Sequence, residues 1–189
     1  ATLYWEAFGA KLGKTLRPER KALAFLARVI DPQFAIAARD NRGALLGIAG
    51  YKTADGALVG GGFGDLAATY GIVGACWRAA LLSLVERKLS HGVLLMDGIF
   101  VTAEARGKGV GTSLLDAIKE EAATQGCAEV RLDVINTNPR ARALYERSGF
   151  SPGETQHLGP FKHIFGFSSS LEMRYTLQAQ SGNCRDAAN

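Results

Sequence analysis

Along the second half of the chain, segments with the hydrophobic pattern of a strand alternate with a segment that has the pattern of a helix. Residues 93–101 form an almost unbroken apolar run, which predicts a buried strand. Over residues 110–122 the apolar side chains recur every four positions, which predicts an amphipathic helix that ends near Gly126. Residues 129–134 then alternate polar and apolar, as in a strand with one covered face. Two strands joined by a helix in this way are expected to run parallel.

The first half predicts helices followed by a hairpin. Residues 3–12 carry apolar side chains at helical spacing. A second helix is expected between Pro18, which suits a first helical position, and Pro32, which ends it. The apolar segments 34–39 and 45–52 flank a polar, glycine-containing turn and therefore predict a β-hairpin.

The middle of the chain predicts a flexible connection and a long helix. The glycine-rich segment 60–64 has no lysine after it, and Asp65 would repel an anion, so a connecting segment is favoured over a phosphate loop. An amphipathic helix is expected over residues 72–89, with core packing as its simplest role. Its predicted apolar stripe is Val73, Trp77, Ala80, Leu81, Leu84 and Val85.

Helix-capping residues delimit one more helix near the C-terminus. Asn138 is a suitable N-cap, Pro139 fits the first helical position, and Gly149 fits the position after the end. Two last strands are expected from Phe150 onward and over residues 171–177. We expect a single domain over residues 1–177 and a polar tail over residues 178–189.

Three glycines at alternate positions separate the strand at 93–101 from the helix that follows it. Gly107, Gly109 and Gly111 leave backbone N–H groups uncovered at a helix N-terminus, which predicts a phosphate-binding turn. A P-loop is excluded, because Gly111 is followed by Thr112 and the nearby lysine, Lys108, lies inside the turn.

A dinucleotide-binding turn stays open as a weaker alternative. Thr112 occupies the place of its third small residue, and Asp133 could stand for the ribose-binding acid. That fold would need a further strand and helix in parallel order, whereas the chain after Phe150 predicts only a hairpin.

Residues 101–111, together with the segment from Asn138 to Phe150, resemble the GNAT superfamily of acetyl-CoA-dependent N-acetyltransferases. The family pattern is Arg/Gln-x-x-Gly-x-Gly/Ala after a strand, followed about thirty residues later by Asn-x-x-Ala-x-x-Leu-Tyr-x-x-x-Gly-Phe. Both halves occur here in order and at the family's spacing.

The resemblance implies an α/β (α+β) fold. Its mixed, mostly antiparallel twisted sheet has helices on both faces, and its central parallel strand pair is splayed. The pantetheine arm of acetyl-CoA would enter between the strands at 93–101 and 129–134. The resemblance also implies a GNAT-type acyl-CoA N-acyltransferase, with acetyl-CoA as cosubstrate and no metal. The residues expected to bind the cosubstrate are Ile99, Phe100, Val101, Arg106, Gly107, Lys108, Gly109, Val110, Gly111, Thr112, Asn138 and Tyr145.

Acetyl transfer from a thioester to an amine suggests two catalytic candidates. A departing thiolate, whose thiol has a pKa of about 8.5, can take a proton from a phenol of pKa about 10 if the transfer is concerted, so Tyr145 is the candidate acid. The N–H of Phe100 or Val101 could polarise the carbonyl. Asp97 is the candidate base, because regular alternation would place it on the same side of the strand as Val101. A structural role for Asp97, accepting from a nearby N–H group, is an equal alternative.

Composition limits the partners and the compartment only coarsely. The 189 residues carry a formal net charge of +4 without a basic run, so a nucleic-acid partner is not indicated. Three widely spaced cysteines, no signal-peptide pattern and no long apolar run favour a cytoplasmic protein without a membrane partner. The acceptor could be a small-molecule or a protein amine, and the long helix could form a homodimer face. A non-catalytic acyl-CoA-binding module is the alternative function.

Overall fold

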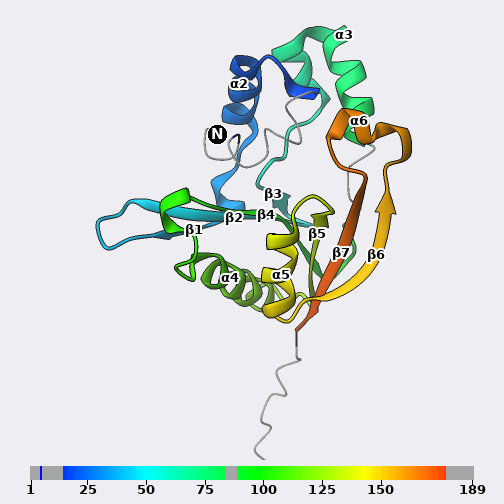
Figure 1. Ribbon diagram of the computed structural model, residues 1–189. Helices are drawn as coiled ribbons and strands as arrows, with labels where there is room; N and C mark the ends of the chain where they lie inside the picture. The colour runs from blue at the N-terminus through cyan, green and yellow to red at the C-terminus, as the bar shows by residue number, and fades with distance from the viewer. Residues whose placement is uncertain (1–4, 6–14, 84–88, 178–189) are drawn as a thin grey trace, which may run out of the picture.

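A computed structural model describes residue 5, residues 15–83 and residues 89–177 (Figure 1). The helices are α2 (Glu19–Val29), α3 (Phe63–Ser83), α4 (Val110–Thr124), α5 (Pro139–Arg147) and α6 (Lys162–Phe165). The strands are β1 (Ala35–Arg39), β2 (Leu45–Thr53), β3 (Gly56–Ala57), β4 (Val93–Val101), β5 (Glu129–Ile135), β6 (Ser151–His157) and β7 (Ser169–Thr176). Short 3-10 turns lie at Pro32–Phe34, Ala103–Ala105 and Gly159–Phe161.

In the described part of the chain the strands form one seven-stranded sheet in the order β1-β2-β4-β5-β7-β6, with β3 paired to β2. Its neighbours run antiparallel except for β4 and β5, which are parallel. Figure 1 shows α4 and α5 on one side of the sheet and α2 and α3 on the other. The expected mixed, mostly antiparallel fold is confirmed. A dinucleotide-binding fold is excluded, because it requires several parallel strands in succession.

The strands and the helix that were predicted from regular hydrophobic patterns are confirmed, with bounds close to those expected. β4 has the expected bounds at both ends, and β5 is one residue longer than expected. β1 and β2 form the expected hairpin, in which the Asp40 carboxylate accepts hydrogen bonds from the N–H groups of Arg42 and Ala44. The stripe on α4 lies against the sheet, and its side chains at Leu114, Ile118 and Ala122 are buried. Burial of each leucine or isoleucine contributes about 1.5–3 kcal/mol.

The prediction for the middle helix was wrong in two respects. α3 begins at Phe63, inside the segment expected to be a flexible connection, and Gly71 interrupts it with φ 73° and ψ 165°. Ala75 is buried in a cluster with residues of α2, whereas Val73 and Trp77 of the expected core stripe are 83% and 42% exposed. The predicted stripe lies wholly after the break at Gly71, and this piece of the helix packs through Ala75 rather than through Val73 and Trp77.

We call α2 and α3 together the helical cap. Arg78 of α3 holds the segment just before α2, because its guanidinium donates a hydrogen bond to the Arg17 carbonyl oxygen. Within α3 the same guanidinium lies 3.9 Å from the Tyr70 ring centre and donates to the Gly74 carbonyl oxygen. At the N-terminal end of α3, Asp65 accepts a hydrogen bond from Gly62 N–H and pairs with Arg28 of α2 at 2.8 Å. Asp65 therefore holds the start of α3 against α2.

Of the described helices, only α3 is long and apolar enough to cross a membrane by length and composition. Its non-helical break at Gly71 divides it into two shorter pieces. A span needs about 20 helical residues, so neither piece alone is long enough.

Some of the expected segments lie outside the described residues. They are the helix over 3–12 apart from Trp5, residues 84–88 of the long helix, and the polar tail over 178–189.

The connection between β6 and β7 contains α6, a helical turn that the sequence did not predict.

Candidate functional site

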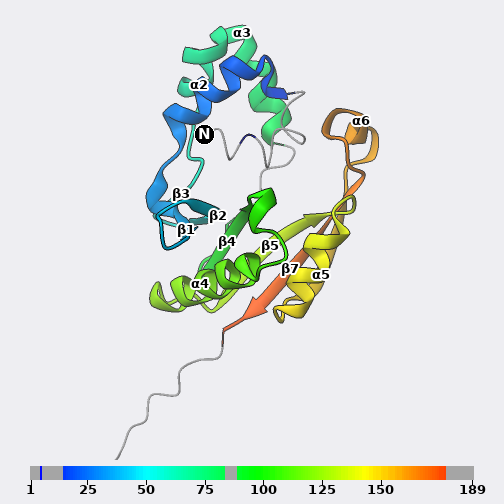
Figure 2. The ribbon, with the colours of Figure 1, turned by 60° about the vertical axis from the view of Figure 1, so that its left-hand side comes forward.

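The parallel strands β4 and β5 pair over only three positions before they separate. Their Cα partners are Val93 with Glu129, Leu94 with Val130 and Leu95 with Arg131. Beyond Leu95, β4 continues to Val101 in register with β2, and β5 continues to Ile135 in register with β7. The splayed central pair expected from the family resemblance is confirmed (Figure 2).

A β-bulge lies directly after the last β4–β5 pair. Gly50 of β2 is opposite Gly98, but Tyr51 is opposite Met96, so Asp97 is the extra residue. A bulge bends its strand and increases the local twist, which accounts for the separation of β4 from β5 at this point. The inserted residue also reverses the alternation of side chains, since Met96 and Ile99 both pack in the core that contains α4.

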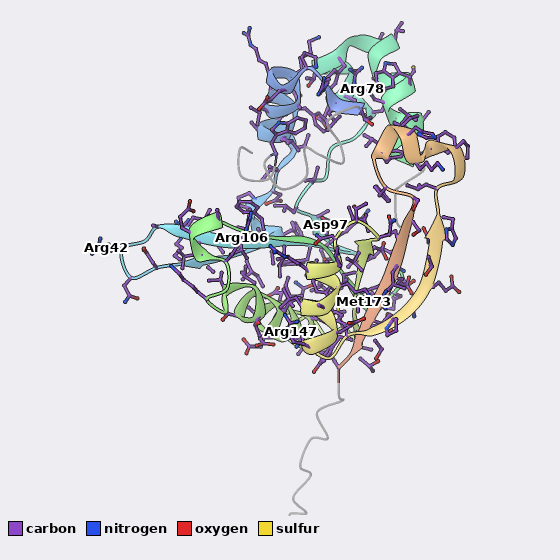
Figure 3. The ribbon with its side chains drawn as sticks, in the orientation of Figure 1. Arg42, Arg78, Asp97, Arg106, Arg147 and Met173 are labelled. Atoms are coloured by element: carbon purple, nitrogen blue, oxygen red, sulfur yellow. The ribbon has the colours of Figure 1, made fainter. Side chains whose placement is uncertain are left out.

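The prediction that Asp97 lies on the same side of β4 as Val101 is wrong, because it assumed regular alternation along the strand. Val101 packs against the α4 core, and the bulge separates it from Asp97. Figure 3 shows Asp97 at the sheet face toward the helical cap, away from α4 and α5. The role of Asp97 as a base stays a prediction, now placed on the cap side of the sheet.

The direction of the β4 backbone groups follows from one hydrogen bond at the end of the strand. Just beyond the end of β4, Thr102 N–H donates to the carbonyl oxygen of Leu46 in β2, at 2.9 Å. Because successive N–H groups point to opposite edges of a strand, the N–H of Phe100 faces β2 and those of Ile99 and Val101 face the gap beside β5. Of the two candidates for polarising a carbonyl, Val101 is therefore the one that faces the gap.

The glycine turn follows η2 (Ala103–Ala105) and leads into α4. Gly107 and Gly109 have φ values of 75° and 82°, in the left-handed region that favours glycine. Within the described chain, no acceptor is hydrogen-bonded to the N–H groups of residues 107–112, whereas Ser113 N–H donates to the Gly109 carbonyl oxygen. The free N–H groups lie at the positive end of the α4 dipole, as an anion site requires.

Gly111 has a separate role in packing. A Cβ atom on it would lie 3.1 Å from Leu144 Cδ2 and 3.9 Å from Val101 Cγ2. Its lack of a side chain thus allows the first turn of α4 to approach both α5 and β4.

A cleft of about 690 Å³ joins the end of β4, the glycine turn and α5. Ten of the residues predicted to bind the cosubstrate line it: Ile99, Phe100, Val101, Arg106, Gly107, Gly109, Val110, Gly111, Thr112 and Asn138. Lys108 and Tyr145 are not among the lining residues. The structure therefore brings together most of the predicted site, while the binding role of each residue stays a prediction.

Asn138, at the start of α5, borders the cleft, whereas Tyr145 on the same helix is buried. The Asn138 side chain caps the helix by accepting a hydrogen bond from Ala141 N–H at 3.2 Å, and it borders the cleft. Tyr145 is only 6% exposed and packs in the core, with its ring centre 6.1 Å from that of Phe150. The predicted acid is thus buried beneath the cleft-lining surface of α5, and proton donation by Tyr145 stays a prediction.

Five further residues line the cleft that were not among those expected to bind the cosubstrate, although the sequence left open that Arg140 and Arg147 reach its phosphates: Ala105, Arg140, Ala141, Leu144 and Arg147. Four of them lie on α5 at positions i, i+1, i+4 and i+7, which share one face of a helix. That spacing could have revealed them once Asn138 was recognised as the N-cap.

No group of three or more histidine, cysteine, aspartate or glutamate side chains in the described residues is placed to hold a metal ion. His157 ends β6, the last strand in the sheet order, and His163 lies on α6 in the connection from β6 to β7; neither lines the cleft. The described site therefore consists of backbone amides, an apolar strand end and basic side chains.

Comparison with known proteins agrees with this geometry. The model of the acetyltransferase (GNAT) family matches residues 2–150. Thialysine N-epsilon-acetyltransferase from Bos taurus is 36% identical over 56 residues, which are 30% of this chain and 33% of that protein. Mycothiol acetyltransferase from Beutenbergia cavernae is 46% identical over 48 residues, or 25% of this chain and 16% of that protein. The aligned region thus spans a third or less of the length of these two relatives.

Solved structures share the fold at lower sequence identity. Nourseothricin acetyltransferase superposes with a TM-score of 0.52 at 21% identity, covering 76% of this chain and 65% of that one. A Bacillus anthracis protein described as a streptothricin acetyltransferase was solved in complex with acetyl coenzyme A. It superposes with a TM-score of 0.52 at 17% identity, covering 76% of this chain and 62% of that one. The parted strands, the glycine turn and the family match over most of the sequence lead to one conclusion: this chain belongs to the GNAT family of acetyltransferases.

Proposed function

We propose that the protein transfers an acetyl group from acetyl-CoA to a primary amine, by direct attack of the amine in a ternary complex. The observation that carries the proposal is the separation of β4 from β5 beside a turn of free amides. Together these features offer a slot for an extended pantetheine arm and an anion site for the diphosphate to which that arm is attached.

Each group at the slot has a chemical task in this reaction. The cosubstrate supplies an acetyl group activated as a thioester. The N–H groups of Ile99 and Val101 would bind the amides of the pantetheine arm, as a neighbouring strand would. In the transfer, the nitrogen of a neutral amine forms a bond to the carbonyl carbon, the bond from that carbon to sulfur breaks, and the Val101 N–H stabilises the negative oxygen.

Two protons must move in this scheme. The amine loses one to a base, which we assign to Asp97 acting through water from the cap side of the sheet. The thiolate gains one from the phenol of Tyr145. A carboxylate and a phenol on different elements would therefore serve the two sides of the same reacting carbon.

The burial of Tyr145 favours a second candidate function, an acyl-CoA-binding module without turnover. Replacement of Tyr145 by Phe separates the two functions. For a transferase, turnover should fall about 100-fold while the Kd for acetyl-CoA stays unchanged, because general acid catalysis contributes about 10²–10⁴-fold. Turnover is measured as release of free CoA with a panel of small-molecule and peptide amines, and Kd by calorimetry.

Tyr175→Phe is the matched control. Tyr175 packs against the same Phe150 ring, at 5.5 Å between ring centres, but lies on β7 outside the motif. Equal loss of turnover in both variants would assign the effect to packing of the aromatic cluster. Wild-type protein that binds acetyl-CoA but acetylates no amine in the panel would support the binding module.

A further inference from the structure

The cleft-lining face of α5 carries two arginines with no acidic partner. Arg140 and Arg147 both line the cleft and are exposed. Among the described residues, no carboxylate lies within ion-pair distance of either guanidinium. Arg142 lies on another face of the same helix and pairs with Glu146 at 2.8 Å. The helix therefore neutralises the arginine that faces away from the cleft and leaves free the two that face it.

Helix geometry places Arg140 and Arg147 on one line. Their separation of seven residues is close to two turns and corresponds to a rise of about 10 Å along the axis. Leu144 lies between them on the same face and contacts the first turn of α4 beside Gly111. One arginine thus flanks this contact on each side, with the free amides of the glycine turn across the cleft.

The cosubstrate of the proposed function carries a second phosphate group besides the diphosphate assigned to the glycine turn. Its diphosphate fits the free amides at the start of α4, next to Arg106, whose Nε donates to the Val101 carbonyl oxygen at 3.3 Å. Coenzyme A also has a 3′-phosphate on its ribose, and this group needs separate cations if it is recognised. Arginine suits a phosphate because its planar fork of donors matches two phosphate oxygens.

We propose that Arg140 and Arg147 bind the 3′-phosphate of coenzyme A, so that the protein selects CoA against dephospho-CoA. The proposal rests on the proposed acetyl-CoA site but is separable from it. Dephospho-CoA keeps the pantetheine arm and the diphosphate and lacks only the group in question. Arg147 could instead stabilise the C-terminus of α5, where a cation interacts favourably with the helix dipole. In that case the affinities for CoA and dephospho-CoA would be equal.

The test is calorimetric titration of the intact chain with CoA and with dephospho-CoA. Wild-type protein should bind CoA at least about tenfold more tightly than dephospho-CoA, because one charge-assisted hydrogen bond contributes about that much affinity. In Arg140→Gln and in Arg147→Gln the Kd for CoA should rise, while the Kd for dephospho-CoA stays near the wild-type value. Arg142→Gln is the matched control, which should leave the ratio of the two constants unchanged.

Three results would overturn the inference. Wild-type protein with equal affinity for both ligands would refute recognition of the 3′-phosphate and leave the acetyl-CoA site standing. Weakening of both ligands by the same factor in Arg140→Gln and Arg147→Gln would assign these residues to the diphosphate or to helix stability. Wild-type protein that binds neither ligand would refute the proposed function itself. A melting temperature measured for each variant distinguishes loss of contact from loss of fold.

Discussion

Replacement of Gly109 by alanine tests whether the glycine turn holds an anion through its backbone. Gly109 has φ 82° and lines the cleft, and a Cβ atom built on it meets no heavy atom within 4 Å. The substitution therefore creates no clash, and its cost is conformational, about 1–2 kcal/mol for a left-handed non-glycine residue. Relief of this strain requires a different φ at residue 109, which would turn the neighbouring N–H groups away from the cleft.

Gly126→Ala is the control that carries the same strain elsewhere. Gly126 has φ 68°, also meets nothing within 4 Å, and follows the opposite end of α4, outside the cleft. For a chain of 189 residues, a loss of about 1–2 kcal/mol should lower the melting temperature by about 2–8 °C in both variants. The two proteins should thus be destabilised alike.

Only Gly109→Ala should lose affinity for CoA. A hydrogen bond to a charged group contributes about 1.5–3 kcal/mol, so loss of one such bond raises the Kd about 10- to 150-fold. Calorimetric titration with CoA gives the Kd, and thermal unfolding gives the stability. If Gly109→Ala binds CoA as tightly as Gly126→Ala does, the turn does not bind the diphosphate through its amides.

Two further outcomes are expected. Burial and, secondarily, the Glu121 charge raise the pKa of Tyr51, whose hydroxyl donates to Glu121 at 3.1 Å. Because the folded-state pKa is raised, the stabilisation is complete below the unfolded pKa of about 10 and is lost as pH rises through the folded value. Urea unfolding between pH about 9 and 11 should therefore show a steeper loss for wild type than for Tyr51→Phe, and parallel curves would contradict this cause. Gly47→Ala should destabilise the β2–β4 pair, since its Cβ would lie 2.6 Å from the Phe100 carbonyl oxygen. Gly62→Ala is the control, because its φ is not in the left-handed region and its Cβ would meet no heavy atom within 4 Å. Urea unfolding should show a larger loss of stability for Gly47→Ala than for Gly62→Ala, and equal losses would refute the steric account.

The elements predicted most accurately are those with local determinants. The Asn138-Pro139 start and the Gly149 end of α5 each act on the backbone next to them, and the structure shows the cap hydrogen bond at Asn138 and φ 86° at Gly149. The bounds of β4 follow from its continuous apolar run in the same way. Such signals do not depend on how distant parts of the chain pack.

The start of α3 shows what local signals miss. Gly62 and Gly64 have low helix propensity and favour a loop. The helix nevertheless begins at Phe63, because Asp65 bonds to the Gly62 N–H and to Arg28, which is 37 residues away in sequence. A contact of that separation leaves no periodic trace, so only the folded chain reveals it. The face of α3 that is buried depends likewise on contacts with residues of α2 that are distant in sequence.

One pair of residues links the sequence to the site more directly than the motif does. Asp97 and Gly98 interrupt an apolar strand, and an isolated glycine with a polar neighbour inside a strand is a sign of a bulge. The bulge at this position begins where β4 and β5 stop pairing, after Leu95 and Arg131. It bends β4 away, leaves the N–H groups of Ile99 and Val101 without a described strand partner, and puts the side chains of Ile99 and Val101 on the α4 face, opposite to Asp97. The slot for the cosubstrate and the placement of Val101 and the candidate base on opposite faces of β4 are therefore two consequences of a single inserted residue.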